Sequence, residues 1–263
     1  MADEKLTVVD YIRSILGIAT FFVVLLTATP FIILALILSG GAVTNFVMET
    51  VGPAMMKPVF AVSGIDFNMR YHCDPIERPA VYIVNHSSTV DVLTIIALGL
   101  PRIRFVAKWE LQYNPLFFII GRLTGQVFIK RGNTDKAVKT LQNVYDRVKR
   151  KKLSVLMAPE GSRKHPGVIG PFKKGPFRMA MDLNYPIVPI YFEGNRELSA
   201  GGSLLSKSGT VIAHVHRAIE TSGWTLENLE EHIREVRSRY LEWAGVEQDE
   251  VDAIAKSGRV PGE

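Results

Sequence analysis

A histidine and an aspartate stand five residues apart where an apolar stretch gives way to polar residues. The segment 85–91 contains His86 and Asp91, follows the apolar run 81–84 and precedes a helical pattern at 92–98. On a regular helix, a five-residue separation turns the chain by about 140°, so the two side chains would point apart. They pair only if His86 lies on the turn before the helix and Asp91 lies in its first turns. The aspartate would then fix one imidazole tautomer and leave the other ring nitrogen as a base.

This spacing is weak evidence when it stands alone. His72 and Glu77 repeat it, but Pro75 lies between them and no helical pattern follows. Taken by itself, His86 also fits a structural histidine that caps a helix. Other segments must decide between the two interpretations.

Two further segments place charged residues after predicted strands. The stretch 125–131 delivers Arg131, whose guanidinium fork suits a phosphate group, although an ordinary solvated strand end has the same pattern. In the stretch 158–163, Gly161 favours a tight turn that carries Glu160 and Arg163. This pair either forms an ion pair or offers an acceptor and a phosphate clamp to a ligand.

A third segment, 185–190, has a strand bracketed by Pro186 and Pro189. Prolines confine a strand to the edge of a sheet or to its own ends, so this pattern favours an edge strand.

Strands and helices alternate through most of the chain. Apolar runs predict strands at 81–84, 103–106, 126–129, 154–157, 187–192 and 210–215. Amphipathic patterns predict helices at 92–98, 134–152, 177–183 and 226–243. The order predicts an α/β sandwich around a mostly buried sheet.

The amino-terminal region is apolar enough to enter a membrane. No charged residue lies between Arg13 and Glu49, and the run 15–38 exceeds the roughly 20 residues that cross a bilayer. Pro30 is expected to kink or break this helix, and glycines follow at 40–41. Either one kinked span or a two-helix hairpin satisfies the pattern. A signal peptide is disfavoured because the leader lacks a positive charge excess.

Charge and cysteine content exclude several classes of protein. The 263 residues carry a net charge of +5, and the mean hydropathy is +0.14. Basic clusters at 147–152 and 173–178 fit a solvated helix end, or a surface for anionic lipid headgroups or an acidic carrier. No zinc or aromatic nucleic-acid motif accompanies them. The single cysteine, Cys73, excludes a disulfide framework.

The order of the segments resembles the 1-acyl-sn-glycerol-3-phosphate acyltransferases, a family of glycerolipid acyltransferases. That family carries N-H-x-S-x-x-D, G-x-x-F-I-x-R, F-P-E-G-T-R-S and a proline-bracketed block in this order. They match residues 85–91, 125–131, 158–164 and 186–189. The stretches 106–111 and 172–180 resemble two further family segments. Departures at Ser87, Ala158, Ser162 and Lys164 retain every charged site residue but leave the acceptor lipid open.

The resemblance implies a mechanism and a division of the chain. Its general base pair would be His86 and Asp91, and its substrate-binding residues would be Lys108, Arg131, Glu160, Gly161, Ser162 and Arg163. The acyl or thioester group would lie against Pro186, Ile187, Val188 and Pro189. We expect a membrane-anchoring segment at 1–55, a catalytic α/β sandwich domain with a mixed sheet at 56–245 and a polar tail at 246–263.

The implied reaction is transfer of a fatty acyl group from acyl-CoA or acyl carrier protein to lysophosphatidic acid, giving phosphatidic acid. No metal or organic cofactor is expected, and the cytoplasmic face of a membrane is the expected location. Another lyso-lipid acceptor, such as lyso-ornithine lipid, stays open. Two rivals are a covalent route through Ser87 or Ser88 and a non-catalytic membrane-binding protein with the same fold.

Overall fold

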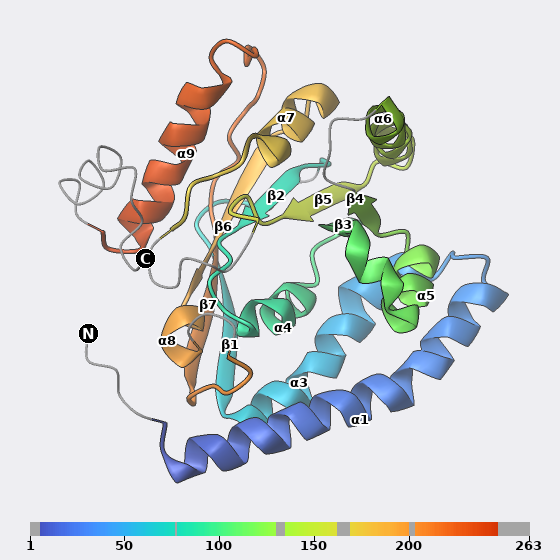
Figure 1. Cartoon of the computed structure of the whole chain (residues 1–263), viewed down its shortest axis with the longest axis vertical. Helices are drawn as coiled ribbons and strands as arrows, with labels where there is room; N and C mark the ends of the chain where they lie inside the picture. The colour runs from blue at the N-terminus through green and yellow to red at the C-terminus, as the bar shows by residue number, and fades with distance from the viewer. Residues whose placement is uncertain (1–5, 77, 130–134, 162–168, 200–202, 247–263) are drawn as a thin grey trace.

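A seven-stranded sheet forms the centre of the molecule (Figure 1). The computed structural model describes residues 6–76, 78–129, 135–161, 169–199 and 203–246. In chain order the strands are β1 (Ile65–Tyr71), β2 (Val81–Val84), β3 (Ile103–Lys108), β4 (Val127–Ile129), β5 (Ser154–Met157), β6 (Ile187–Glu193) and β7 (Gly209–Val215). Their order across the sheet is β1-β7-β6-β2-β5-β3-β4.

The strands β2 to β6 all point the same way. β2 pairs in parallel with β5 and β6, and β3 pairs in parallel with β4 and β5. β7 runs antiparallel to β6 and parallel to β1, so the sheet is mixed, as predicted. The segments that follow β2, β5 and β6 therefore meet at one edge of the sheet, where ligand sites of α/β folds gather.

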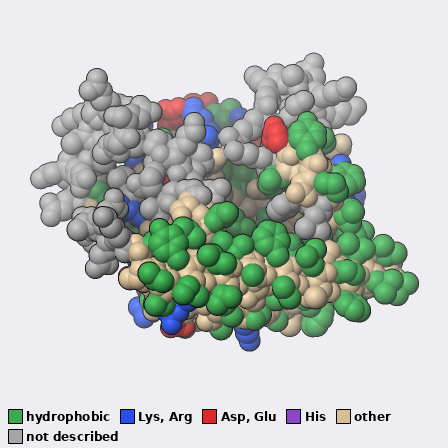
Figure 2. Space-filling model, turned by 60° about the horizontal axis from the view of Figure 1, so that its bottom comes forward, with side chains coloured by type: hydrophobic (Ala, Val, Ile, Leu, Met, Phe, Trp, Pro, Cys, Tyr) green, Lys and Arg blue, Asp and Glu red, His purple; other side chains and the backbone are tan. Residues whose placement is uncertain are grey.

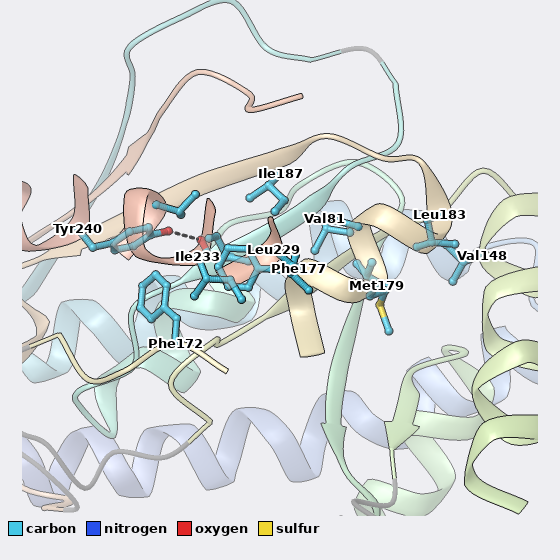
Figure 3. Packing of buried hydrophobic residues seen from close by; sticks show 14 of the residues in the cluster. Val81, Val148, Phe172, Phe177, Met179, Leu183, Ile187, Leu229, Ile233 and Tyr240 are labelled. Atoms are coloured by element: carbon cyan, nitrogen blue, oxygen red, sulfur yellow. Dashed lines mark hydrogen bonds between the residues drawn. The ribbon is translucent and has the colours of Figure 1, made fainter. Parts of the chain in front are cut away.

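Helices cover both faces of the sheet (Figure 1). The helices α6 (Asp135–Arg150), α7 (Lys174–Leu183) and α9 (Leu229–Trp243) cover one face, where Val81 and Ile83 of β2 enter the core drawn in Figure 3. On the other face, Tyr82 and Val84 join a second cluster. Both faces of β2 are buried, which is why its four residues form a continuous apolar run.

Shorter elements complete the second layer. They are α2 (Thr44–Phe46), a π-helix (Val47–Val51), α3 (Gly52–Ser63), α4 (Val90–Ala97), a 3-10 helix (Trp109–Tyr113), α5 (Pro115–Leu123) and α8 (Asn195–Leu198). The strands and helices expected from the sequence all occur, with boundaries shifted by a few residues. β1, α3 and α5 were not expected.

The amino-terminal segment forms a helical hairpin. α1 (Val8–Leu38) continues through Pro30 without a break, so the expected break is wrong. Thr29 and Leu36, on either side of the proline, are buried. After a turn at 39–43, α3 returns along α1 (Figure 1). The two helices pack closely at Gly17, where a Cβ would lie 2.0 Å from the hydroxyl of Ser63.

One side of α1 is fixed to the domain and the other side is apolar and exposed. Ser14 is buried, and its hydroxyl donates to the carbonyl of Ser206 over 2.9 Å. The hydrophobic side chains of the opposite side form a continuous band (Figure 2). By length and composition, α1 is the one helix in the described ranges that could cross a membrane.

Pro189 lies inside the sheet, so the predicted edge strand is wrong. β6 runs between β2 and β7 although proline cannot donate to a ladder. The missing amide faces the β7 side, where the carbonyl of Pro189 accepts the amide of His216 over 3.0 Å. On the β2 side, the hydroxyl of Tyr240 from α9 donates to the carbonyl of Ile83 over 2.7 Å (Figure 3). The same hydroxyl accepts the amide of Ile190 over 3.1 Å, so a buried tyrosine bridges β2 and β6 next to the proline.

Candidate active site

Asn85, the first residue after β2, pairs through its side chain with the backbone of Phe192 in β6. The Asn85 side chain donates to the carbonyl of Phe192 over 3.1 Å and accepts its amide over 2.7 Å. These two bonds continue the β2–β6 ladder by one step through a side chain. The chain can then turn at His86 with no buried backbone group of Phe192 left unpaired.

His86 and Asp91 form the pair that their spacing allows. α4 begins at Val90, so His86 lies on the preceding turn and Asp91 in the first helical turn. Nδ1 of His86 lies 2.9 Å from Oδ2 of Asp91, which also accepts the amide of Ser88 over 2.9 Å. A carboxylate only accepts, so Nδ1 carries the proton and Nε2 presents a lone pair. The Asp91 side chain is fully buried, whereas 21% of the His86 side chain is exposed.

Asn195 completes the surroundings of the aspartate, and the sequence reasoning missed it. Its amide donates to Oδ1 of Asp91 over 2.7 Å and to the hydroxyl of Thr94 over 3.1 Å. Asn195 is completely buried at the start of α8, one residue after Gly194. Gly194 has a φ of +91°, and a Cβ there would lie 2.2 Å from a backbone oxygen of β7. A glycine at the end of a predicted strand was the available signal.

Glu160 follows β5 and is turned inward. Its Oε1 accepts the amide of His86 over 2.9 Å, and its Oε2 accepts the amide of Gly170 over 3.0 Å. The side chain is 5% exposed, and burial raises the pKa of Glu160 to about 7, although both amide bonds act in the opposite direction. The carboxylate therefore holds the backbone of the histidine.

Arg237 of α9 binds the loop that contains Gly170, whose amide Glu160 accepts. Its guanidinium donates to the carbonyls of Ile169 and Gly170 over 2.8 Å and 3.0 Å. Burial lowers the pKa of Arg237, and the nearby Glu160 opposes this shift. The loop at Gly170 is therefore held from two sides, by Glu160 after β5 and by Arg237 of α9.

Several predicted site residues lie outside the described residues: Arg131, Ser162 and Arg163. Lys108 ends β3, but its side chain is also outside the description, as is Glu77. Gly161 has a φ of +69°, as its predicted turn requires.

The proline-bracketed strand is buried. The side chains of Ile187 and Val188 are 0% and 2% exposed and belong to the two opposite core clusters. Pro186 and Pro189 are also buried. The role of this block in acyl binding stays a prediction.

Comparison with known proteins gives the family. The family model described as Acyltransferase matches residues 63–193. The chain is 31% identical to the human 1-acyl-sn-glycerol-3-phosphate acyltransferase beta over 188 residues, which is 70% of this chain and 67% of the human protein. The chain belongs to this acyltransferase family.

Other relatives agree with this assignment. A putative 1-acyl-sn-glycerol-3-phosphate acyltransferase of Caenorhabditis elegans is 32% identical over 162 residues, or 61% of this chain. The chain spans 57% of the nematode protein and 53% of a coconut relative, Cocos nucifera 1-acyl-sn-glycerol-3-phosphate acyltransferase.

A solved structure has the same fold. The crystal structure of the 1-acyl-sn-glycerophosphate (LPA) acyltransferase PlsC from Thermotoga maritima superposes with a TM-score of 0.65 at 22% identity. The match covers 89% of this chain and 98% of that chain.

Proposed function

We propose that this protein transfers a fatty acyl group from acyl-CoA or acyl carrier protein to the sn-2 hydroxyl of lysophosphatidic acid. The product is phosphatidic acid, so the enzyme would serve phospholipid biosynthesis. The observation that carries the proposal is the His86–Asp91 pair, held at the edge of the sheet in a chain of this acyltransferase family.

The chemistry needs one base and no covalent intermediate. Nε2 of His86 takes the proton of the acceptor hydroxyl while its oxygen attacks the thioester carbonyl carbon. The tetrahedral oxyanion collapses, the C–S bond breaks, and the thiolate leaves and regains a proton from the imidazolium. Asp91 stabilises that imidazolium and keeps Nδ1 as a donor.

The direct route is favoured by the positions of the neighbouring serines. Ser88 is fully buried, and its hydroxyl accepts the amide of Val90 over 3.0 Å. A nucleophile must reach its base and its substrate together. Ser88 serves the helix start instead, which supports the hydroxyl of the acceptor as the nucleophile.

The phosphate of the acceptor would be bound beside the histidine. We propose Arg131 and Arg163 as its main partners, with Lys108, Gly161 and Ser162 next to them, on the basis of the family resemblance. Glu160 would act mainly as a positioning residue, because both of its oxygens accept backbone amides. The apolar side of α1 would place the catalytic domain on the cytoplasmic face of a membrane.

The reaction can be tested with purified protein in detergent. Wild type and His86→Ala are incubated with radiolabelled acyl-CoA, or acyl carrier protein, and lysophosphatidic acid. We expect phosphatidic acid from the wild type and a loss of at least roughly 100-fold in the variant, the usual contribution of a positioned base. A product from other lyso-lipids only, such as lyso-ornithine lipid, would refute the acceptor.

Initial-rate kinetics test the route itself. Direct transfer requires both substrates on the enzyme at once and gives a sequential pattern. A covalent acyl-enzyme gives ping-pong kinetics, which would refute the direct mechanism. Undiminished activity of His86→Ala would exclude the histidine as the base.

A further inference from the structure

A basic cavity lies at the opposite edge of the sheet from His86. It has a volume of about 460 Å³ and is bounded by the turn after α1, the end of α5, the start of β3 and the end of α6. Its cationic lining residues are Arg102, Arg104, Arg122, Arg147, Arg150, Lys151 and Lys152. A volume of this size accommodates a small ligand.

The position separates this cavity from the proposed catalytic site. Arg104 is the second residue of β3, and Leu153 immediately precedes β5, so the cavity adjoins the amino-terminal ends of these strands. His86 and Glu160 follow the carboxyl ends of β2 and β5. A strand of six residues such as β3 separates the two edges by about 20 Å. One lipid phosphate cannot contact both sites.

Arg104 is buried and Arg147 is half-buried, and neither forms an ion pair within the part of the chain that the structure describes. Arg104 is 6% exposed and donates to the carbonyl of Ile103 and to Asn45, both neutral. Arg147 donates through Nη2 to the carbonyl of Gln126 over 3.4 Å, while its buried Nε has no hydrogen-bond partner. Among the ion pairs of the described residues, none involves a residue of this lining. Buried guanidinium groups normally require compensation by an anion.

The pKa of Arg104 and the backbone conformation of two lining residues also set this cavity apart from an ordinary surface. Burial lowers the pKa of Arg104, and repulsion from Arg147 adds to this shift, while Glu49 opposes it. Arg102 and Lys152 have positive φ values of 52° and 48°, which disfavour side chains with a Cβ. Both of these backbones line the cavity.

A solvated helix end explains only part of this arrangement. Basic residues at 147–152 are favourable near the carbonyl end of α6 and would be expected there without a ligand. That explanation does not account for Arg104 and Arg122, which come from β3 and α5 and converge on the same space. A common negative partner would relieve the repulsion between cations that converge from three elements.

We propose that this cavity is a second anion site, which binds a phosphate group. The phosphate belongs either to the headgroup of an anionic membrane lipid or to a soluble phosphate compound. The lipid source has a structural argument: residues 40–42 and Thr44 of the lining directly follow the apolar helix α1. Guanidinium groups suit this ligand because they bind phosphate oxygens bidentately. The proposal does not rest on the acyl-transfer activity.

The test uses the full chain and a double variant, Arg104→Gln with Arg147→Gln. The matched control removes two exposed arginines of α9, Arg234→Gln with Arg239→Gln. Melting temperatures are measured in detergent with increasing inorganic phosphate at constant ionic strength. They are also measured in nanodiscs of phosphatidylcholine with and without phosphatidylglycerol.

We expect the cavity variant to lose a ligand-dependent rise in melting temperature that the wild type and the control retain, with phosphate affinity at least tenfold weaker. A loss seen only with phosphatidylglycerol identifies a lipid headgroup, and a loss seen with free phosphate identifies a soluble ligand. Binding at the catalytic site would be common to all three proteins. Because the two arginines repel each other, the ligand-free variant should melt no lower than the wild type.

Equal responses of the cavity variant and the wild type in both experiments would overturn the proposal. If the double variant does not fold, Arg122→Gln replaces it, because this side chain is exposed and contributes little to the core. For this single variant too, a lost ligand-dependent rise in melting temperature supports the proposal, and a response equal to that of the wild type overturns it.

Discussion

Glu160 is expected to make the stability of this protein depend on pH in a defined direction. Burial raises the pKa of Glu160 to about 7, compared with 4.5 for the model carboxyl group. Between these two pH values, the folded chain binds a proton that the unfolded chain has released. The free energy of unfolding therefore falls as the pH rises from about 4.5 to about 7. At about 1.4 kcal/mol per pH unit, the loss amounts to about 3 kcal/mol.

The variant Glu160→Gln removes this titration. Thermal unfolding is followed by tryptophan fluorescence in detergent at several pH values from about 5 to about 8. The wild type should lose roughly 6–12 °C of melting temperature relative to the variant over this range, at about 2–4 °C per kcal/mol for a chain of this size. The control Glu242→Gln removes an exposed carboxylate and should follow the wild type.

Parallel pH profiles for wild type and Glu160→Gln would refute the reasoning, since they would mean that the buried carboxyl group titrates like an ordinary one. A profile in which the wild type gains stability relative to the variant with rising pH would reverse the sign. It would indicate that the amides of His86 and Gly170 outweigh the desolvation of the carboxylate.

Two further substitutions test the supports of the site. Asn195→Ala removes one donor from Asp91, so we expect kcat to fall roughly tenfold at nearly unchanged KM, since a charge-assisted hydrogen bond contributes about 1.5–3 kcal/mol. A lower melting temperature at unchanged kcat would show that Asn195 serves only the fold. Tyr240→Phe leaves the buried carbonyl of Ile83 without its hydroxyl donor and should destabilise the chain by about 2–3 kcal/mol in denaturant unfolding. A loss below about 0.5 kcal/mol would contradict a stabilising bridge from this hydroxyl between Ile83 and Ile190.

The parts that the sequence predicts correctly are those fixed by short-range patterns. The turn and helix start around His86 and Asp91 involve residues within a few positions of one another, so spacing alone constrained their geometry. β1 also had a local signal, because apolar and polar residues alternate along Ile65–Tyr71, yet it was not among the expected strands. Local periodicity was therefore sufficient for most of the sheet.

The parts that escaped prediction depend on contacts between distant segments. Asn195 lies 104 residues from the aspartate that it contacts, and Arg237 lies 67 residues from the carbonyl of Gly170. The bridge between Ile83 and Ile190 depends on a hydroxyl from α9, which no strand propensity reveals. Polar partners of this kind are set by the order of strands in the sheet, and one sequence without relatives does not specify that order.

The attachment of α1 bears on how the protein would contact a membrane. Its 31 residues extend about 46 Å, more than the roughly 30 Å of hydrocarbon in a bilayer. However, Gly17 packs against α3 and Ser14 bonds to the loop before β7. A helix that crossed the bilayer would draw these contacts and the polar groups around them into hydrocarbon, at a cost of several kcal/mol for each group left unpaired. We therefore expect α1 to lie along the membrane surface with its exposed apolar side immersed.

Single cysteines at the two ends and in the middle of α1 distinguish the two orientations. The positions are Val8, Leu38 and Leu26, which are 75%, 77% and 68% exposed, introduced one at a time after Cys73→Ser. Each cysteine is labelled with bimane, and its depth in vesicles is measured by quenching with lipids brominated along the acyl chain. Val8 and Leu26 lie about five full turns apart on one face, so they should be quenched to the same shallow depth. Deep quenching at Leu26 with shallow quenching at both ends would mean that α1 spans the bilayer. In that case the contacts between α1 and the domain would have to open on insertion, because a domain held against one side of the helix cannot remain in water along its whole length.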